Sequence, residues 1–302
     1  MKEKLQTELY DYQAAADGPT VLILAGVHGD EYEPMLALAR LRQLLENKLQ
    51  KGRVKLMPVV NKSAFQQGQR CGEDGLDLAR VCPGDLDGST TLRYAALVSE
   101  QIASVDYLID LHTGGQLFDL YPLSGYMLHT DVAILEKQRR MAKCFGLPLI
   151  WGTDPYLDGR TLSVARDHQV PAIYVEYGGP GPIRTEVVEA YLQGCMQVLQ
   201  DLEMIEGAAL LLKEPDYWVE DDDLGAGYLQ GKMQSPVEGI FEGRVQVGDQ
   251  VKKGDLWGIV YASTDFEPQE VFADTDGLVL FTRAVPKVKA ADSLGGILPL
   301  KR

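Results

Sequence analysis

Four short runs of apolar, largely β-branched residues recur through the first two thirds of the chain, and helical patterns separate them. The runs are residues 20–26 (TVLILAG), 53–61 (RVKLMPVVN), 105–112 (VDYLIDLH) and 171–178 (PAIYVEYG). Between the first two runs, apolar residues recur at helical spacing from Leu36 to Leu45, and further helices are predicted over residues 92–104, 131–145 and 184–204. Unbroken apolar strands that alternate with helices predict an α/β domain whose mostly parallel, mixed sheet is flanked by helices.

The pattern changes after residue 206, where an acidic, turn-rich segment leads into short strands punctuated by glycine. We therefore predict an α/β domain over residues 1–206 and a smaller all-β domain over residues 207–302, with the acidic run 220–223 as a solvated linker. The stretch VQVGDQVKKGDLWGIV resembles the hammerhead sandwich of biotinyl and lipoyl carrier domains. The segment that follows, STDFEPQ (263–269), has no carrier lysine, which favours a structural or covering role.

Composition narrows the range of partners. The chain has 302 residues, 45% of them hydrophobic, and its 29 Lys and Arg against 44 Asp and Glu give a net charge of −15. Such a charge disfavours nucleic acid and anionic membranes, which leaves small molecules or proteins as partners. No run of 18 apolar residues occurs and the N-terminus is charged, so we expect a cytoplasmic protein. Nothing in the sequence sets the oligomeric state, and a homo-oligomer remains one alternative.

The four cysteines show no CxxC spacing and are too few to staple a chain of this size. Free, buried thiols are therefore the expectation at Cys71, Cys82, Cys144 and Cys195, with a Cys71–Cys82 bridge as the alternative.

Polar side chains follow the predicted strands where each one ends. The first strand is followed by His28 and Glu31, and the third ends in His112. In open parallel sheets, ligands bind beyond the carboxyl ends of the strands. Two imidazoles and one carboxylate, with a fourth position left for water, are the ligand set of a catalytic zinc site. The alternative for each histidine is a hydrogen-bonded structural residue.

Other polar residues fall at or near the same strand ends. The second strand leads to Asn61 and then Arg70, and the fourth carries Glu176. Asp110 shares a strand face with His112 and either supports that ring or makes a plain structural hydrogen bond. His129 and His168 are expected at surface or supporting positions.

Five segments occur in a characteristic order: HGDE, NKSAFQQGQR, DGLDLAR, DLHTGG and VPAIYVEYGG. Together they resemble the succinylglutamate desuccinylase/aspartoacylase family, relatives of the zinc carboxypeptidases. The resemblance covers residues 20–205 by motif, and the β-rich tail is similar to the second domain of that family. It implies a zinc carboxypeptidase-like fold.

The resemblance also implies roles for residues at matching positions. One zinc ion per chain is held by His28, Glu31 and His112, and Asp77 orients one of the zinc-bound histidines. Arg70 polarises the scissile carbonyl, and Glu176 is the general base.

The resemblance assigns substrate binding to Asn61, Arg80 and Arg166. This chain departs from the family pattern at one of these positions, because family members commonly have Asn-Arg where it has Ala79-Arg80. Alanine has no side-chain donor, so half of the expected carboxylate clamp is missing. Lys62 also stands where proline usually follows the asparagine.

The leading hypothesis is a zinc-dependent hydrolase that cleaves the amide bond of a small N-acyl amino acid or related N-acyl amine. A zinc carboxypeptidase-like peptidase would use the same residues and is the alternative among enzymes. A binding or scaffolding protein that kept the fold without catalysis is the alternative outside enzymes.

Overall fold

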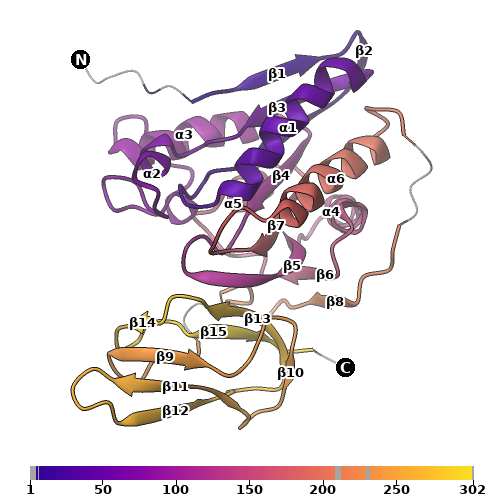
Figure 1. Ribbon diagram of the computed structural model, residues 1–302. Coiled ribbons are helices and arrows are strands. Elements are labelled where there is room, and N and C mark those ends of the chain that lie inside the picture. The colour runs from indigo at the N-terminus through magenta and orange to yellow at the C-terminus, as the bar shows by residue number, and fades with distance from the viewer. Residues whose placement is uncertain (1–4, 6, 208–211, 229–231, 301–302) are drawn as a thin grey trace.

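A central sheet separates two layers of helices in the computed structural model, which describes residues 5, 7–207, 212–228 and 232–300 (Figure 1). The main path of this sheet runs in the order β1 (Tyr10–Gln13), β3 (Lys51–Met57), β2 (Ala16–Leu24), β4 (Tyr107–His112), β7 (Ala172–Gly178), β5 (Phe118–Met127), β13 (Gly277–Arg283) and β10 (Gln250–Val251). Off this path, β6 (Leu149–Thr153) pairs with β5 and β8 (Tyr217–Glu220), and β15 (Gly295–Leu298) pairs with β13. Strands β3, β2, β4 and β7 are parallel, whereas β5 runs antiparallel to β7, so the predicted mixed, mostly parallel sheet is confirmed.

Helices cover both faces of the sheet. One face carries α1 (Tyr32–Lys48), α4 (Val132–Phe145) and α6 (Thr185–Asp201), and the other carries α3 (Thr90–Ile102) and α5 (Thr161–Asp167). Alternate residues of β2 face the two layers, because Val21 and Ile23 join the first core while Leu22 and Leu24 join the second. The short helices α2 (Lys62–Gln67) and η1 (Leu78–Arg80) lie in the connection after β3.

The four predicted strands and the helices between them are confirmed, whereas strands β1, β5, β6 and β8 and the short helices α2, η1 and α5 were missed. Strand β5 contains Pro122 and Gly125, both of which weaken a strand signal in a sequence. Strand β6 spans five residues, and α2 and α5 span six and seven. The four cysteines are free, as predicted. No helix in the described part of the chain is long and apolar enough to cross a bilayer.

The C-terminal third forms a second sheet and also extends the first. The second sheet is antiparallel, in the order β12 (Pro268–Phe272), β11 (Leu256–Ala262), β9 (Gly239–Gly243) and β14 (Lys287–Val288). Strand β13 pairs with β5 of the central sheet, with Phe281 opposite Leu120 (Figure 1). The proposed domain boundary after residue 206 stands directly before residues 208–211, which lie outside the described residues, and it stays a prediction.

Strand β8 is held to the α/β part by partly buried hydrogen bonds of Glu220 with an arginine and a tyrosine. The Glu220 carboxylate accepts two hydrogen bonds from the Arg139 guanidinium, at 2.8 and 2.6 Å, and a third from the Tyr126 hydroxyl at 2.5 Å. The prediction that the run beginning at Glu220 is a solvated linker is therefore wrong for this residue, which ends a strand. The hydrogen bonds from Arg139 outweigh burial and lower the pKa of Glu220.

We expect Glu220→Gln to lower the free energy of unfolding at pH 7 by about 1–3 kcal/mol, because it removes the charge from three hydrogen bonds. A carboxyl with a lowered folded pKa contributes stability above its unfolded pKa of about 4.3 and loses it as pH falls through the folded value. Urea unfolding at pH 7 and at a pH below both values should therefore show the difference shrinking. The exposed Glu214, paired with Lys143, provides the control Glu214→Gln, which should change stability far less.

Candidate metal centre and active site

The loop after β2 brings the first two candidate ligands to the carboxyl edge of the sheet. A Cβ at Gly29 would lie 2.0 Å from the Ala64 carbonyl carbon, so the loop can press against α2 only with glycine there. Two residues later, Glu31 occupies the N-cap position of α1, yet its side chain makes no capping hydrogen bond. It turns instead toward two histidines, which departs from the usual use of an acidic residue at that position.

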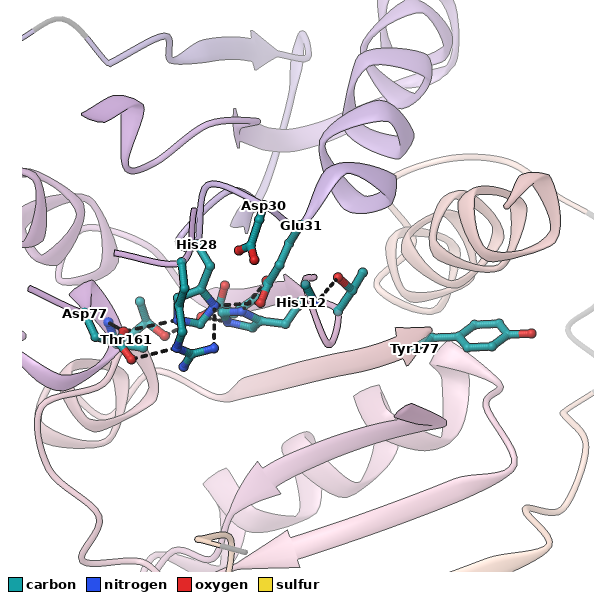
Figure 2. Close-up of polar contacts among 12 residues, drawn as sticks. His28, Asp30, Glu31, Asp77, His112, Thr161 and Tyr177 are labelled. Atoms are coloured by element: carbon teal, nitrogen blue, oxygen red, sulfur yellow. Dashed lines mark hydrogen bonds and ion pairs between the residues drawn. The ribbon is translucent and has the colours of Figure 1, made fainter. Parts of the chain in front are cut away.

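Glu31 lies between His28 and His112, which ends β4 (Figure 2). One carboxylate oxygen is 2.7 Å from His28 Nδ1, and the other is 3.0 Å from His112 Nδ1. All three residues are buried. The structure therefore brings together the three residues that the sequence assigns to one metal ion.

The far nitrogens of both rings face carboxylates. His28 Nε2 is 3.2 Å from an oxygen of Asp77, and His112 Nε2 is 3.1 Å from an oxygen of Asp110. If each ring donates Nε2–H to its carboxylate, a neutral ring points its Nδ1 lone pair at Glu31. Either a proton on Nδ1 or a metal ion between the two groups makes this contact favourable. The ligand atoms all lie within 4.8 Å of one another, and two ligands of a tetrahedral zinc ion are about 3.3 Å apart. His28, Glu31 and His112 could thus hold a zinc ion.

Electrostatics within the cluster follow from burial and close opposite charges. Burial by itself would raise the pKa of Glu31, but His28 and His112 outweigh it and lower that pKa to about 2. Burial would lower the pKa of His112, but the negative charges of Asp110 and Glu31 hold it well above its ordinary value. Asp110 lies against His112 Nε2 and also accepts a hydrogen bond from the Thr161 hydroxyl. Because of its contact with His112, the structure favours support of that ring over the other role predicted for Asp110.

Arg70 and Glu176 flank the cluster. The Arg70 guanidinium donates to Asp77 at 2.9 Å and lies 3.5 Å from His28 Nδ1. Glu176 is the register partner of His112 on the neighbouring strand β7. Burial, with a smaller contribution from Glu31, raises the pKa of Glu176 to about 7, although the histidines and Arg70 oppose the rise. A carboxylate poised near neutral pH suits a general base.

A cavity of about 140 Å³ opens beside these residues and is lined by His28, Arg70, His112 and Glu176. The 3-10 helix η1 adds Ala79 and Arg80 to its wall. The C-terminal third adds Tyr228, Leu280 and Phe281, which agrees with a covering role for the β-rich part.

Two residues expected at the substrate lie elsewhere. Asn61 is fully buried, and its side-chain oxygen accepts a hydrogen bond from the Ala64 amide, which caps α2. Arg166 binds Asp158, Asp167 and a backbone carbonyl. Neither lines the cavity, because a helix cap and an outward-facing cluster of carboxylates already hold these groups.

Arg160 lines the cavity and was not predicted. It occupies the N-cap position of α5, in the loop after β6. The missing signal was β6 itself: recognising LPLIWGT as a strand would have marked the following loop as a place for ligand-binding residues. His129 and His168 do not line the cavity, so neither joins the cluster.

Comparisons with known proteins agree with this geometry. Residues 17–202 match the profile of the succinylglutamate desuccinylase/aspartoacylase catalytic domain. The chain is 31% identical over 290 residues to N-alpha-acetyl-L-2,4-diaminobutyric acid deacetylase from Halomonas elongata, covering 93% of this chain and 82% of that protein.

Solved structures extend the similarity over nearly the whole chain. A succinylglutamate desuccinylase/aspartoacylase from Rhodobacter sphaeroides is 27% identical with a TM-score of 0.84, covering 99% of this chain and 90% of the other. The product-bound ectoine utilization protein EutE (DoeB) from Ruegeria pomeroyi is 25% identical, also with a TM-score of 0.84, covering 96% and 87%.

We expect His112→Ala to weaken zinc binding by more than about 100-fold, because loss of a ligand should exceed the 10- to 100-fold cost of losing a supporting partner. Asp77→Asn leaves all three ligands in place and weakens the contacts of Asp77 with His28 and Arg70, so its effect should fall within that smaller range. Competition with a chelator measures both affinities. His129→Ala removes a histidine outside the cavity and should leave zinc affinity unchanged. An equal affinity for wild type and His112→Ala would contradict the site.

Proposed function

This chain belongs to the succinylglutamate desuccinylase/aspartoacylase family, and from that premise we propose that it is a zinc-dependent hydrolase of small N-acyl amino acids or related N-acyl amines. One observation carries the proposal: the His28–Glu31–His112 cluster opens on the same cavity as Arg70 and Glu176. A metal-binding group, the half-buried cation Arg70 and a carboxylate with a pKa near 7 are the parts that hydrolysis of an amide needs.

Each side chain has a role that its position allows. A zinc ion held by the three ligands would act as a Lewis acid and lower the pKa of bound water. Glu176 accepts a proton from the attacking water as the new C–O bond forms at the amide carbon. Arg70 donates a hydrogen bond to the carbonyl oxygen as negative charge develops there. Glu176 then passes the proton to the amine nitrogen, the C–N bond breaks, and a carboxylic acid and a free amine leave.

Two arginines favour a substrate that carries a carboxylate. Arg80 and Arg160 both line the cavity, and among the described residues neither forms an ion pair with a carboxylate. Burial, followed by the positive charge of Arg80, lowers the pKa of Arg160. An anionic group on the substrate would relieve this repulsion through charge-assisted hydrogen bonds. Arg160 thus supplies a second guanidinium beside Arg80, where Ala79 offers no donor.

The substrate class is supported by the relatives and by the shape of the cavity. The name of the Halomonas elongata relative describes removal of an acetyl group from an N-acetylated amino acid. Residues of the C-terminal third, including Leu280 and Phe281, form part of the cavity wall and limit its volume to about 140 Å³. A small N-acyl amino acid is favoured over a peptide chain for this reason. Comparing hydrolysis of N-acetyl amino acids with that of C-terminal dipeptides tests the peptidase alternative.

We expect Glu176→Gln to keep zinc bound and to lower kcat by about 10²–10⁴-fold, because glutamine preserves the shape of the side chain and cannot accept the proton. Metal content and steady-state kinetics on the same preparation measure the two effects. Near-normal kcat in a zinc-loaded Glu176→Gln enzyme would mean that another group accepts the proton.

We expect Arg160→Met to reduce kcat/KM for an N-acetyl amino acid by about tenfold or more, since one charge-assisted hydrogen bond contributes about 1.5–3 kcal/mol. The same variant should lose little activity on the corresponding amide, which lacks the carboxylate. Arg166→Met is the matched control and should leave both substrates unaffected. If Arg166→Met had the larger effect, the assignment of the substrate carboxylate to Arg160 would be wrong.

A further inference from the structure

The cavity continues beyond the catalytic residues over an aromatic floor. Register across four strands places Asp110, Tyr174, Gly125 and Trp151 in one row, next to the row that holds His112 and Glu176. A Cβ on Gly125 would lie 2.3 Å from the Tyr174 ring, so that ring lies across the glycine. Tyr174 and Trp151 both line the cavity and form its floor on this side.

Charge is confined to one end of the cavity. The lining residues from β5, β6 and β13 are uncharged, and most are apolar. We call these residues and Tyr174 the aromatic end of the cavity. They are Phe118, Leu120, Leu123, Met127, Trp151, Thr153, Tyr174, Leu280 and Phe281. The charged lining residues lie instead on β4, on β7 and in the loops that carry His28, Arg70, Arg80 and Arg160.

The aromatic end holds one buried donor without an acceptor. Trp151 is 5% exposed, and its Nε1–H has no hydrogen-bond partner among the described residues. The other two tryptophans are satisfied: Trp218 donates to the Tyr126 hydroxyl and Trp257 to the Leu294 carbonyl. A buried N–H left unpaired is costly, so a donor beside a cavity indicates an acceptor supplied by the ligand.

We propose that the amine half of the substrate is an α-amino acid with an uncharged side chain, whose apolar stem packs on the aromatic end and whose oxygen or sulfur atom accepts the Trp151 Nε1–H. The proposal rests on the proposed function. The side chain and the carboxylate leave the same carbon, and their binding groups adjoin, because Thr161 next to Arg160 binds Asp110 at the start of the row of Tyr174 and Trp151.

Charged side chains fit this end poorly. An ammonium group on the side chain would face the Trp151 N–H donor. Of the two carboxylates in the cavity wall, Glu176 is engaged by the reaction. One oxygen of Asp110 contacts His112 and Thr161, and its other oxygen has no hydrogen-bond partner among the described residues. A side-chain carboxylate would meet no guanidinium on β5, β6 or β13. The aromatic end has no carboxylate for an ammonium group, whose one candidate partner is the unpaired Asp110 oxygen at the edge of that end. The first test therefore includes 2,4-diaminobutyrate, the amine in the name of the Halomonas elongata relative, as the competing side chain.

The first test compares kcat/KM of the zinc-loaded enzyme for the N-acetyl derivatives of glutamine, methionine, 2,4-diaminobutyrate and aspartate. We expect the two uncharged side chains to exceed both charged ones by at least tenfold. Equal or better hydrolysis of a charged derivative would overturn the proposal while leaving the proposed function standing. If no derivative is hydrolysed, the proposed function fails, and calorimetric binding of the free amino acids decides the side-chain preference without turnover.

The second test isolates the indole N–H. Trp151→Phe keeps an aromatic ring and removes the donor, so kcat/KM should fall about three- to tenfold for N-acetylglutamine. It should change less than twofold for N-acetylhomoleucine, which has the same shape and no acceptor. Trp218→Phe makes the same substitution outside the cavity and should affect neither substrate.

An equal effect of Trp151→Phe on both substrates, or none on either, would overturn the role of the donor. Thermal unfolding of each variant checks the fold, and the first test stands if Trp151→Phe is unstable.

Discussion

Buried charge at the carboxyl ends of β2 and β4 is the constraint on which the rest of this structure depends. Glu31 is 1% exposed, and a carboxylate taken out of water is costly unless cationic or donor groups surround it. His28 and His112 are those partners, and Asp77 and Asp110 hold the far nitrogens of the two rings. The loop after β2, the η1 turn and β4 must therefore lie close together. Gly29 permits the close approach of this loop to α2.

The same constraint divides the cavity into two chemically different ends. Guanidinium groups gather near the buried carboxylates, so Arg70, Arg80 and Arg160 make one end cationic and suited to an anion. The residues of β5, β6 and β13 that line the cavity are uncharged, and most are apolar or aromatic. The substrate that we propose would then place its carboxylate and its uncharged part in a fixed order. That order would set the orientation of the amide bond relative to Glu176.

The C-terminal third takes part in this division. Strand β13 pairs with β5, which fixes Leu280 and Phe281 against the cavity wall by backbone hydrogen bonds of the central sheet. Strand β8 adds to β6 beside Trp151, held by the Glu220–Arg139 contact. The C-terminal third, which resembles a carrier domain in its sequence pattern, thus forms part of the cavity wall. The absence of a lysine in residues 263–269 agrees with a structural role.

Local patterns in the sequence determined the strands that carry His112 and Glu176, the helices around them and the candidate ligands, because periodic apolar residues and strand-end histidines are short-range signals. The motif resemblance added the family, which the comparisons confirm. Only the tertiary structure decided which arginine lines the cavity. Arg160 and Arg166 are six residues apart in the sequence and have similar neighbours there. Arg160 reaches the cavity because it follows β6, a strand too short to be recognised in the sequence, whereas Arg166 is bound by acidic neighbours.

The role of Asn61 was likewise decided by the tertiary structure. It caps a helix, because its nearest donor is the Ala64 amide. The unpaired Trp151 donor depends on register across β7, β5 and β6, a long-range pairing that no local pattern specifies.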